Sequence, residues 1–170
     1  MDNTSGFYPV NMGSIPVRQT TKDTMLVDDL KILLASSFSL YLKGANFHWN
    51  VEGPDFPQYH EFFGDFYSEV YESVDRIAEY IRAMDNYTPA SFARFKELTI
   101  IEDQVGGINT YMMFEELLAD CEELIVFLMQ AFDVSTQEKQ QGIANFLAER
   151  MDAFQKHAWM IRSTMKTIRS

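Results

Sequence analysis

The sequence predicts an all-α protein, in which four long amphipathic helices form a bundle and a short extra helix lies in the connection between the second and the third. Two observations lead to this prediction. Apolar residues recur at spacings of three and four in four long segments, as on one face of a helix, and no segment alternates with period two for long enough to form a strand. A chain of 170 residues, 46% of them hydrophobic, is long enough to bury the single core of such a bundle.

The first two helices follow from this spacing and from the break between them. Helical spacing begins at about Thr21 and persists to about His48. The segment 53–57 then holds one glycine and two prolines, which do not fit together inside a helix, although Pro57 suits the first turn of a new one. Helical spacing continues to Met84, which predicts a second helix about 42 Å long.

The rest of the chain predicts one short helix and two long ones. The segment 91–99, SFARFKELT, is long enough only for a short helix. A third long helix is expected to open at the glycine pair 106–107. Ser135 and Glu138 have the spacing of a capping box, which predicts that a fourth long helix begins there and continues to Ile168.

Residues 1–20 contain glycines and prolines without periodicity, so we expect a flexible N-terminal tail ahead of one domain at 21–168. The single cysteine, Cys121, excludes an intrachain disulfide and favours a reducing compartment, and its place on an apolar helix face predicts burial. No apolar run is long enough to span a membrane and no signal peptide is visible, so we expect a cytoplasmic protein without membrane partners.

The charge balance indicates which partners the surface accepts. Against 14 Lys and Arg the chain has 25 Asp and Glu, a net charge of −11, which repels phosphate and accommodates cations. The last ten residues, 161–170, are basic, but most of them are expected in the last helix. Strong DNA binding is therefore not expected.

The side chains that point to metal chemistry lie around the break and on the second helix. His48 and His60 flank the break. Asp75 and Glu79 lie one helical turn apart and repel each other unless a cation lies near them; the other interpretation is a solvated acidic face. His157 is interpreted as a structural histidine. No Glu-x-x-His motif occurs, so we expect no di-iron centre inside one bundle.

Helix geometry predicts a site between two copies of the chain. The positions that share one broad face, at about 100° per residue, are His60, Gly64, Asp75 and Glu79. His60 and Glu79 are nevertheless about 28 Å apart along the axis, too far for one ion. The midpoint of positions 60 and 79 falls between Glu69 and Val70, and so does that of positions 64 and 75. A two-fold antiparallel pairing of this helix therefore predicts two mixed His and carboxylate sites per dimer.

The segment HWNVEGPDFPQYHEFFGDFYSEVYESVDRIAEYI, which begins at His48, resembles the signature of the Dps family, the DNA-binding proteins from starved cells or mini-ferritins. The resemblance covers about residues 21–168 and implies a ferritin-like fold and a hollow dodecamer built from two-fold dimers. It also implies a ferroxidase, an oxidoreductase that oxidises ferrous iron with peroxide or oxygen under oxidative stress and stores ferric mineral. The implied catalytic and iron-binding residues are His48 and His60 of one subunit with Asp75 and Glu79 of another.

One position departs from the family pattern, because Gly64 stands where Dps proteins usually have Asp. Three interpretations remain: a site with one strong and one weakened iron position, a packing change or drift, and compensation by Asp65 in a distorted helix. Trp49, beside His48, is interpreted either as a shield of the site or as a core residue. The alternative function is a Dps-like shell with an impaired ferroxidase site, which acts as a DNA-protecting or structural oligomer.

Overall fold

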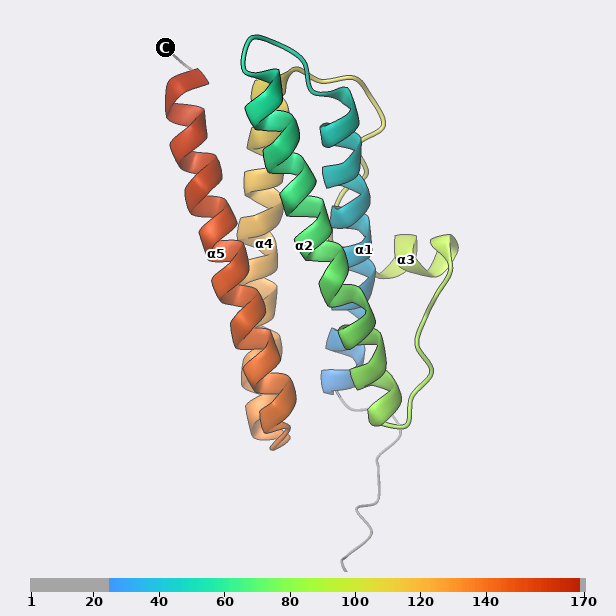
Figure 1. The fold of residues 1–170 in the computed structure, drawn as a ribbon. Helices are drawn as coiled ribbons and strands as arrows, with labels where there is room; N and C mark the ends of the chain where they lie inside the picture. The colour runs from blue at the N-terminus through green and yellow to red at the C-terminus, as the bar shows by residue number, and fades with distance from the viewer. Residues whose placement is uncertain (1–24, 169–170) are drawn as a thin grey trace, which may run out of the picture.

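The computed structural model describes residues 25–168 and confirms the all-α bundle with a short extra helix (Figure 1). No strand occurs in this range. The predicted tail, residues 1–20, lies outside it. The helices are α1 (Met25–Asn50), α2 (Phe56–Ala83), α3 (Phe92–Leu98), α4 (Thr110–Gln137) and α5 (Gln141–Ile168).

The four long helices form two antiparallel hairpins, α1 with α2 and α4 with α5 (Figure 1). A long connection that includes α3 carries the chain back along the bundle, so that α2 and α4 run in the same direction. One such crossover is the connectivity of ferritin-like bundles. None of the helices within residues 25–168 combines the length and the hydrophobicity needed to cross a membrane.

Side-chain caps, which the apolar pattern did not indicate, set the starts of α3 and α4. Ser91 Oγ accepts a hydrogen bond of 3.3 Å from the third backbone N–H beyond it, and Asn109 Oδ1 accepts one of 3.0 Å in the same way. The first residue of α4 is therefore Thr110, and the glycine pair 106–107 stays in the connection.

The predicted capping box at Ser135 and Glu138 is wrong. Helix α4 continues past Ser135, and the chain turns at Lys139, whose φ is 59°. The N–H of Gln140 donates to the carbonyl of Ser135 at 2.8 Å, which is the hydrogen bond of a helix C-terminus. Glu138 caps a different helix, because its Oε1 accepts the N–H of Leu26 in the first turn of α1 at 3.3 Å.

Buried apolar side chains of all four long helices form one core. The largest of them are aromatic, and they include Phe63 and Phe66 of α2, Phe114 of α4 and Phe154 of α5. Cys121 belongs to this core, as predicted, and burial raises the pKa of its thiol. The thiol therefore stays protonated at neutral pH and is no nucleophile.

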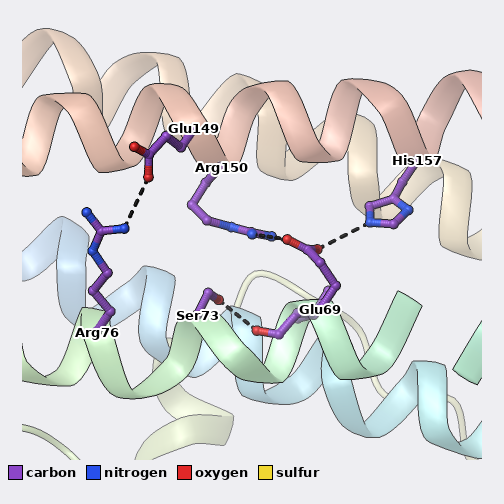
Figure 2. A network of polar contacts seen from close by, with 7 residues as sticks. Glu69, Ser73, Arg76, Glu149, Arg150 and His157 are labelled. Atoms are coloured by element: carbon purple, nitrogen blue, oxygen red, sulfur yellow. Dashed lines mark hydrogen bonds and ion pairs between the residues drawn. The ribbon is translucent and has the colours of Figure 1, made fainter. Parts of the chain in front are cut away.

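Ion pairs with little exposure join the two hairpins. Lys43 of α1 contacts Asp120 of α4 at 2.7 Å, and their side chains are only 5% and 10% exposed. On the other side of the bundle, Arg150 and His157 of α5 both contact the carboxylate of Glu69 on α2 (Figure 2). Buried charges are stabilising only when they are paired, so these contacts define how the hairpins dock.

The contact between α2 and α5 is held by several hydrogen bonds to one carboxylate. Both terminal nitrogens of Arg150 donate to Glu69, and His157 Nε2 donates to Glu69 Oε2 at 3.2 Å. The His157 ring also packs edge-on against Phe66, with 4.8 Å between ring centroids. This geometry agrees with the structural interpretation of His157. Burial disfavours the charge of Glu69, but the hydrogen bonds from His157 and Arg150 outweigh it and lower its pKa from 4.5 to about 2.

The Lys43–Asp120 pair predicts a specific pattern of stabilities. Lys43→Met leaves Asp120 buried without a partner and should lower the free energy of unfolding by about 3–5 kcal/mol. The double variant with Asp120→Leu should recover most of this loss, since no charge remains buried. Urea unfolding at one fixed protein concentration measures both. Lys31→Met is the control, because Asp28 is 64% exposed and the pair should contribute less than about 1 kcal/mol. Equal losses in the single and double variants would contradict the prediction.

The pKa of Glu69 predicts a pH dependence of stability. Because folding lowers this pKa from 4.5 to about 2, the ionised carboxylate stabilises the fold above pH 4.5, and this contribution is lost as the pH falls towards 2. In Glu69→Gln we expect a lower melting temperature at neutral pH. We also expect the melting temperature to fall less steeply between pH 4.5 and pH 2 than it does in the wild type. Circular dichroism melts give both quantities. Glu149→Gln removes an exposed carboxylate from the same pair of helices, so its melting temperature should depend on pH as in the wild type.

Candidate metal centre

The turn between α1 and α2 brings His48 and His60 together. Their rings stack with 3.6 Å between centroids. His48 Nδ1 lies 2.7 Å from the backbone carbonyl oxygen of His60, and His60 Nδ1 lies 2.8 Å from that of His48. A carbonyl oxygen only accepts hydrogen bonds, so the proton of each neutral ring is on Nδ1. The pair therefore locks the tautomer and the orientation of both rings.

These reciprocal hydrogen bonds leave the Nε2 atom of each ring available. Within residues 25–168 neither Nε2 has a hydrogen-bond partner. Metal-bound histidines commonly donate their other ring N–H to a backbone carbonyl, which fixes the ring and raises its basicity as a ligand. The arrangement of His48 and His60 thus fits two nitrogen ligands of a divalent metal. The sequence predicted that both histidines flank the break, but their spacing does not indicate that each ring hydrogen-bonds to the backbone carbonyl of the other.

Gly64 makes room for the His48 ring. A Cβ atom at position 64 would lie 3.2 Å from both Cε1 and Nδ1 of His48, closer than ordinary van der Waals contact. Any side chain there, including the usual Asp of the family, requires the His48 ring to shift. This contact within one chain supports the packing interpretation. Asp65 is exposed, and α2 continues through it without interruption, so no helix distortion brings it to the place of residue 64.

Asp75 and Glu79 are exposed on α2 and lie far along the helix axis from the two histidines. Since α2 is one continuous helix, about 28 Å of axis separates His60 from Glu79. Within the described residues, no three His, Cys, Asp or Glu side chains are close enough to hold a metal ion. One chain therefore brings the histidines together but leaves the carboxylates apart from them, and a four-ligand site needs a second copy.

The face of α2 that such a copy would cover is exposed and partly aromatic. Near the midpoint between His60 and Glu79 it presents Ser68 and Tyr71, and Tyr71 is 52% exposed. Trp49, at the end of α1, is 66% exposed, so its interpretation as a core residue is wrong. Large aromatic side chains on the surface are typical of regions that a partner covers.

Tyr67 is a neighbour of the histidine pair that sequence reasoning missed. Its ring meets the His48 ring edge to face, with 5.3 Å between centroids and an angle of 75°. The signal was present, because at about 100° per residue position 67 lies on the same side of the helix as His60. Tyr67 lies within the segment that resembles the Dps signature, but nothing in that pattern marks it as a neighbour of His48, and the contact is seen only in the structure.

Comparison with known proteins assigns the family. The ferritin-like domain model matches residues 27–170. A low temperature-induced protein of Nostoc sp. is 35% identical over 132 residues, which are 76% of this chain and 74% of that protein. DNA protection during starvation protein 2 of Bacillus anthracis is 31% identical over 124 residues, 73% of this chain and 85% of that protein.

Solved structures agree with the sequence relatives. The Dps protein from Bacillus brevis superposes with a TM-score of 0.80 at 29% identity, covering 82% of this chain and 94% of that chain. Dps from Staphylococcus aureus superposes with a TM-score of 0.82 at 26% identity, covering 85% of this chain and 97% of that chain. The fold and the matches together define a ferritin-like helical-bundle protein. Within that class, the chain belongs to the Dps family.

The contact between Gly64 and His48 predicts opposite effects on helix propensity and on metal binding. Gly64→Ala should raise the helix propensity of α2 by about 1 kcal/mol, and the displacement of the His48 ring offsets this gain. The substitution should also displace the His48 ring from its carbonyl partner, which typically weakens metal affinity by about 10–100-fold. Calorimetric titration of the oligomer with Co²⁺ measures the affinity. Gly142→Ala is the matched control, because a Cβ there has nothing within 4 Å. Unchanged Co²⁺ affinity in Gly64→Ala would show that the close contact has no role in the site.

Proposed function

We propose that this protein oxidises ferrous iron and stores the ferric product inside a homo-oligomeric shell, a dodecamer as in other mini-ferritins. The observation that carries the proposal is the locked pair His48 and His60, whose Nε2 atoms are both available. The carboxylates Asp75 and Glu79 supply the other half of the ligand set from a second subunit.

The donor atoms suit ferrous iron as a substrate. Neutral imidazole nitrogens and carboxylate oxygens form the mixed ligand set that first-row divalent metals favour. Two ferrous ions reduce one hydrogen peroxide molecule to two waters, with two protons consumed, and the same ligands serve when oxygen is the oxidant. A net charge of −11 per chain favours the accumulation of cations.

A two-fold dimer supports this division of ligands. Antiparallel pairing of α2 with its copy around the midpoint between Glu69 and Val70 brings His60 of each chain towards Glu79 of the other. Helix α2 is unbroken over the whole distance, so the register of the pairing is preserved from end to end. Each dimer then contains two equivalent sites, as an isologous interface requires.

Iron chemistry is better supported than DNA protection, although relatives are named for the latter. Among the basic residues near the C-terminus, Arg162 already pairs with Glu122 at 2.8 Å, which neutralises part of that surface. The excess of acidic residues repels the phosphate backbone. The alternative function is a shell without ferroxidase activity, and the experiment below distinguishes it from the ferroxidase.

Mixed oligomers test whether the site is split between subunits. One variant chain has His48→Ala and His60→Ala, and the other has Asp75→Asn and Glu79→Gln. Each alone should lose peroxide-driven iron oxidation. In a one-to-one co-assembled mixture, half of the dimers are mixed, and each of these has one intact site of two, so about a quarter of the sites should be active. Ferric iron formation after anaerobic loading is the measurement.

The outcomes separate the models. Activity in the mixture but in neither parent establishes a shared site. No activity in the mixture would contradict sites split in this way, and full activity in either parent would remove those residues from the site. If wild type oxidised no iron but retarded DNA in a gel at physiological salt, the ferroxidase proposal would fail in favour of the DNA-protecting shell. Glu149→Gln, which changes an exposed carboxylate on α5, is the control chain for co-assembly.

A further inference from the structure

A chain of aromatic rings leads away from the histidine pair along the face between α1 and α2. The Tyr67 ring contacts the His48 ring at 5.3 Å between centroids. Tyr41 follows at 5.9 Å from Tyr67, and Tyr71 at 4.7 Å from Tyr41. All these distances lie within the range of rings in direct contact. Three successive tyrosines, from two helices, therefore connect the candidate metal ligands to the exposed Tyr71.

Tyrosine side chains differ from the Phe residues of the core in one relevant property. A phenol gives up one electron together with its hydroxyl proton and takes both back reversibly, whereas a phenyl ring has no such proton. The phenylalanines Phe47 and Phe63 line the opposite, core-facing side of the α1–α2 turn, with 5.7 Å between their centroids. Phe56 also stacks on His60, but from Tyr67 onward the ring contacts that connect His48 to Tyr71 are made by tyrosines alone.

The proposed function creates a need for such a relay. Hydrogen peroxide accepts two electrons, but one ferrous ion supplies only one. Gly64 removes the carboxylate that Dps proteins usually have at this position, so the second iron position has fewer protein ligands. A site occupied by one ferrous ion would convert peroxide into a hydroxide ion and a hydroxyl radical, with the iron becoming ferric.

We propose that Tyr67, Tyr41 and Tyr71 form a redox relay that removes this oxidising equivalent from the metal site; the inference rests on the proposed function. Tyr67 transfers its hydroxyl hydrogen atom to the hydroxyl radical, which gives water and a Tyr67 phenoxyl radical. The radical passes to Tyr41 and then to Tyr71, each step restoring the previous phenol. A second ferrous ion and a proton finally reduce the phenoxyl radical to tyrosine, and a second proton converts the hydroxide ion of the first step to water. Two ferrous ions and two protons have then reduced one peroxide to two waters.

The end of the relay lies where the two subunits would meet. Tyr71 lies close to the midpoint between Glu69 and Val70, so antiparallel pairing of α2 separates the two Tyr71 residues by only about 4.5 Å along the axis. Two relays, one from each site, then converge at the two-fold axis. An electron from the ferrous ion at one site has a path to the other, and the two sites of a dimer act together on one peroxide.

Trp49 is the competing acceptor, because it follows His48 in sequence and indoles are readily oxidised. Its side chain is 66% exposed, and within residues 25–168 it makes no contact with another ring. A radical on Trp49 would have no onward path of stacked rings. The structure therefore favours Tyr67, which directly contacts the His48 ring.

The experiment uses the intact oligomer, loaded anaerobically with one ferrous ion per site and mixed with one equivalent of hydrogen peroxide. Samples frozen within milliseconds are examined by electron paramagnetic resonance for protein radicals and for ferric iron, and a spin trap reports hydroxyl radicals in parallel. Wild type should show a tyrosyl radical. Tyr67→Phe should lose most of that signal and release trapped hydroxyl radicals, with the ferric yield preserved. Tyr87→Phe is the control, since Tyr87 is 87% exposed and stacks under Arg82 away from the relay.

A second readout tests the convergence at the two-fold axis. Excess peroxide should couple two Tyr71 radicals into a carbon–carbon dityrosine bond, with one ring hydrogen lost from each, seen as a covalent dimer on a denaturing gel. Tyr71→Phe should abolish this dimer while a tyrosyl radical still forms. Ferric iron without a tyrosyl radical in wild type, an unchanged signal in Tyr67→Phe, or a radical confined to Trp49 would each overturn the relay but leave the ferroxidase intact. No ferric iron in wild type would overturn both.

Discussion

The contact of Glu69 with Arg150 and His157 sets the rotation of α2 within the bundle. It fastens one side of α2 to α5, where Phe66 of α2 also packs against His157. Asp75 and Glu79 lie about 120° and 80° around the helix from Glu69, at about 100° per residue, so this contact leaves both of them exposed. Because the hydrogen bonds from His157 and Arg150 lower the pKa of Glu69 to about 2, this carboxylate stays charged well below neutral pH.

The histidine pair is already ordered at the junction of α1 and α2, as its proposed role in binding a metal requires. His48 and His60 satisfy each other through backbone carbonyls, so the chain itself fixes both tautomers. The cost falls on Gly64, since glycine inside a helix disfavours the fold by about 1 kcal/mol relative to alanine. This position gives up both helix propensity and the usual carboxylate of the family in return for space beside the His48 ring.

The same hairpin connects the histidine pair to the face of α2 on which we propose that a second subunit packs. The aromatic contacts from His48 through Tyr67 and Tyr41 reach Tyr71 on the outward side of α2, next to the symmetric midpoint of that helix. In the proposed arrangement the dimer is the smallest unit that contains a complete set of metal ligands. The subunit core, with its paired charges and buried Cys121, serves to hold the two faces of α2 in place.

The sequence by itself determined the four long helices, the burial of Cys121 and the placement of the histidines and carboxylates on one hairpin, because helical periodicity is a local property. It failed at helix ends such as Ser135, where a C-terminal turn at a residue other than glycine has no clear signal. It also left open whether Trp49 is a core residue, and the structure shows that its side chain is exposed. The reciprocal histidine bonds and the Glu69 clamp were decided only by the tertiary structure, since they join residues that come together only when the helices pack.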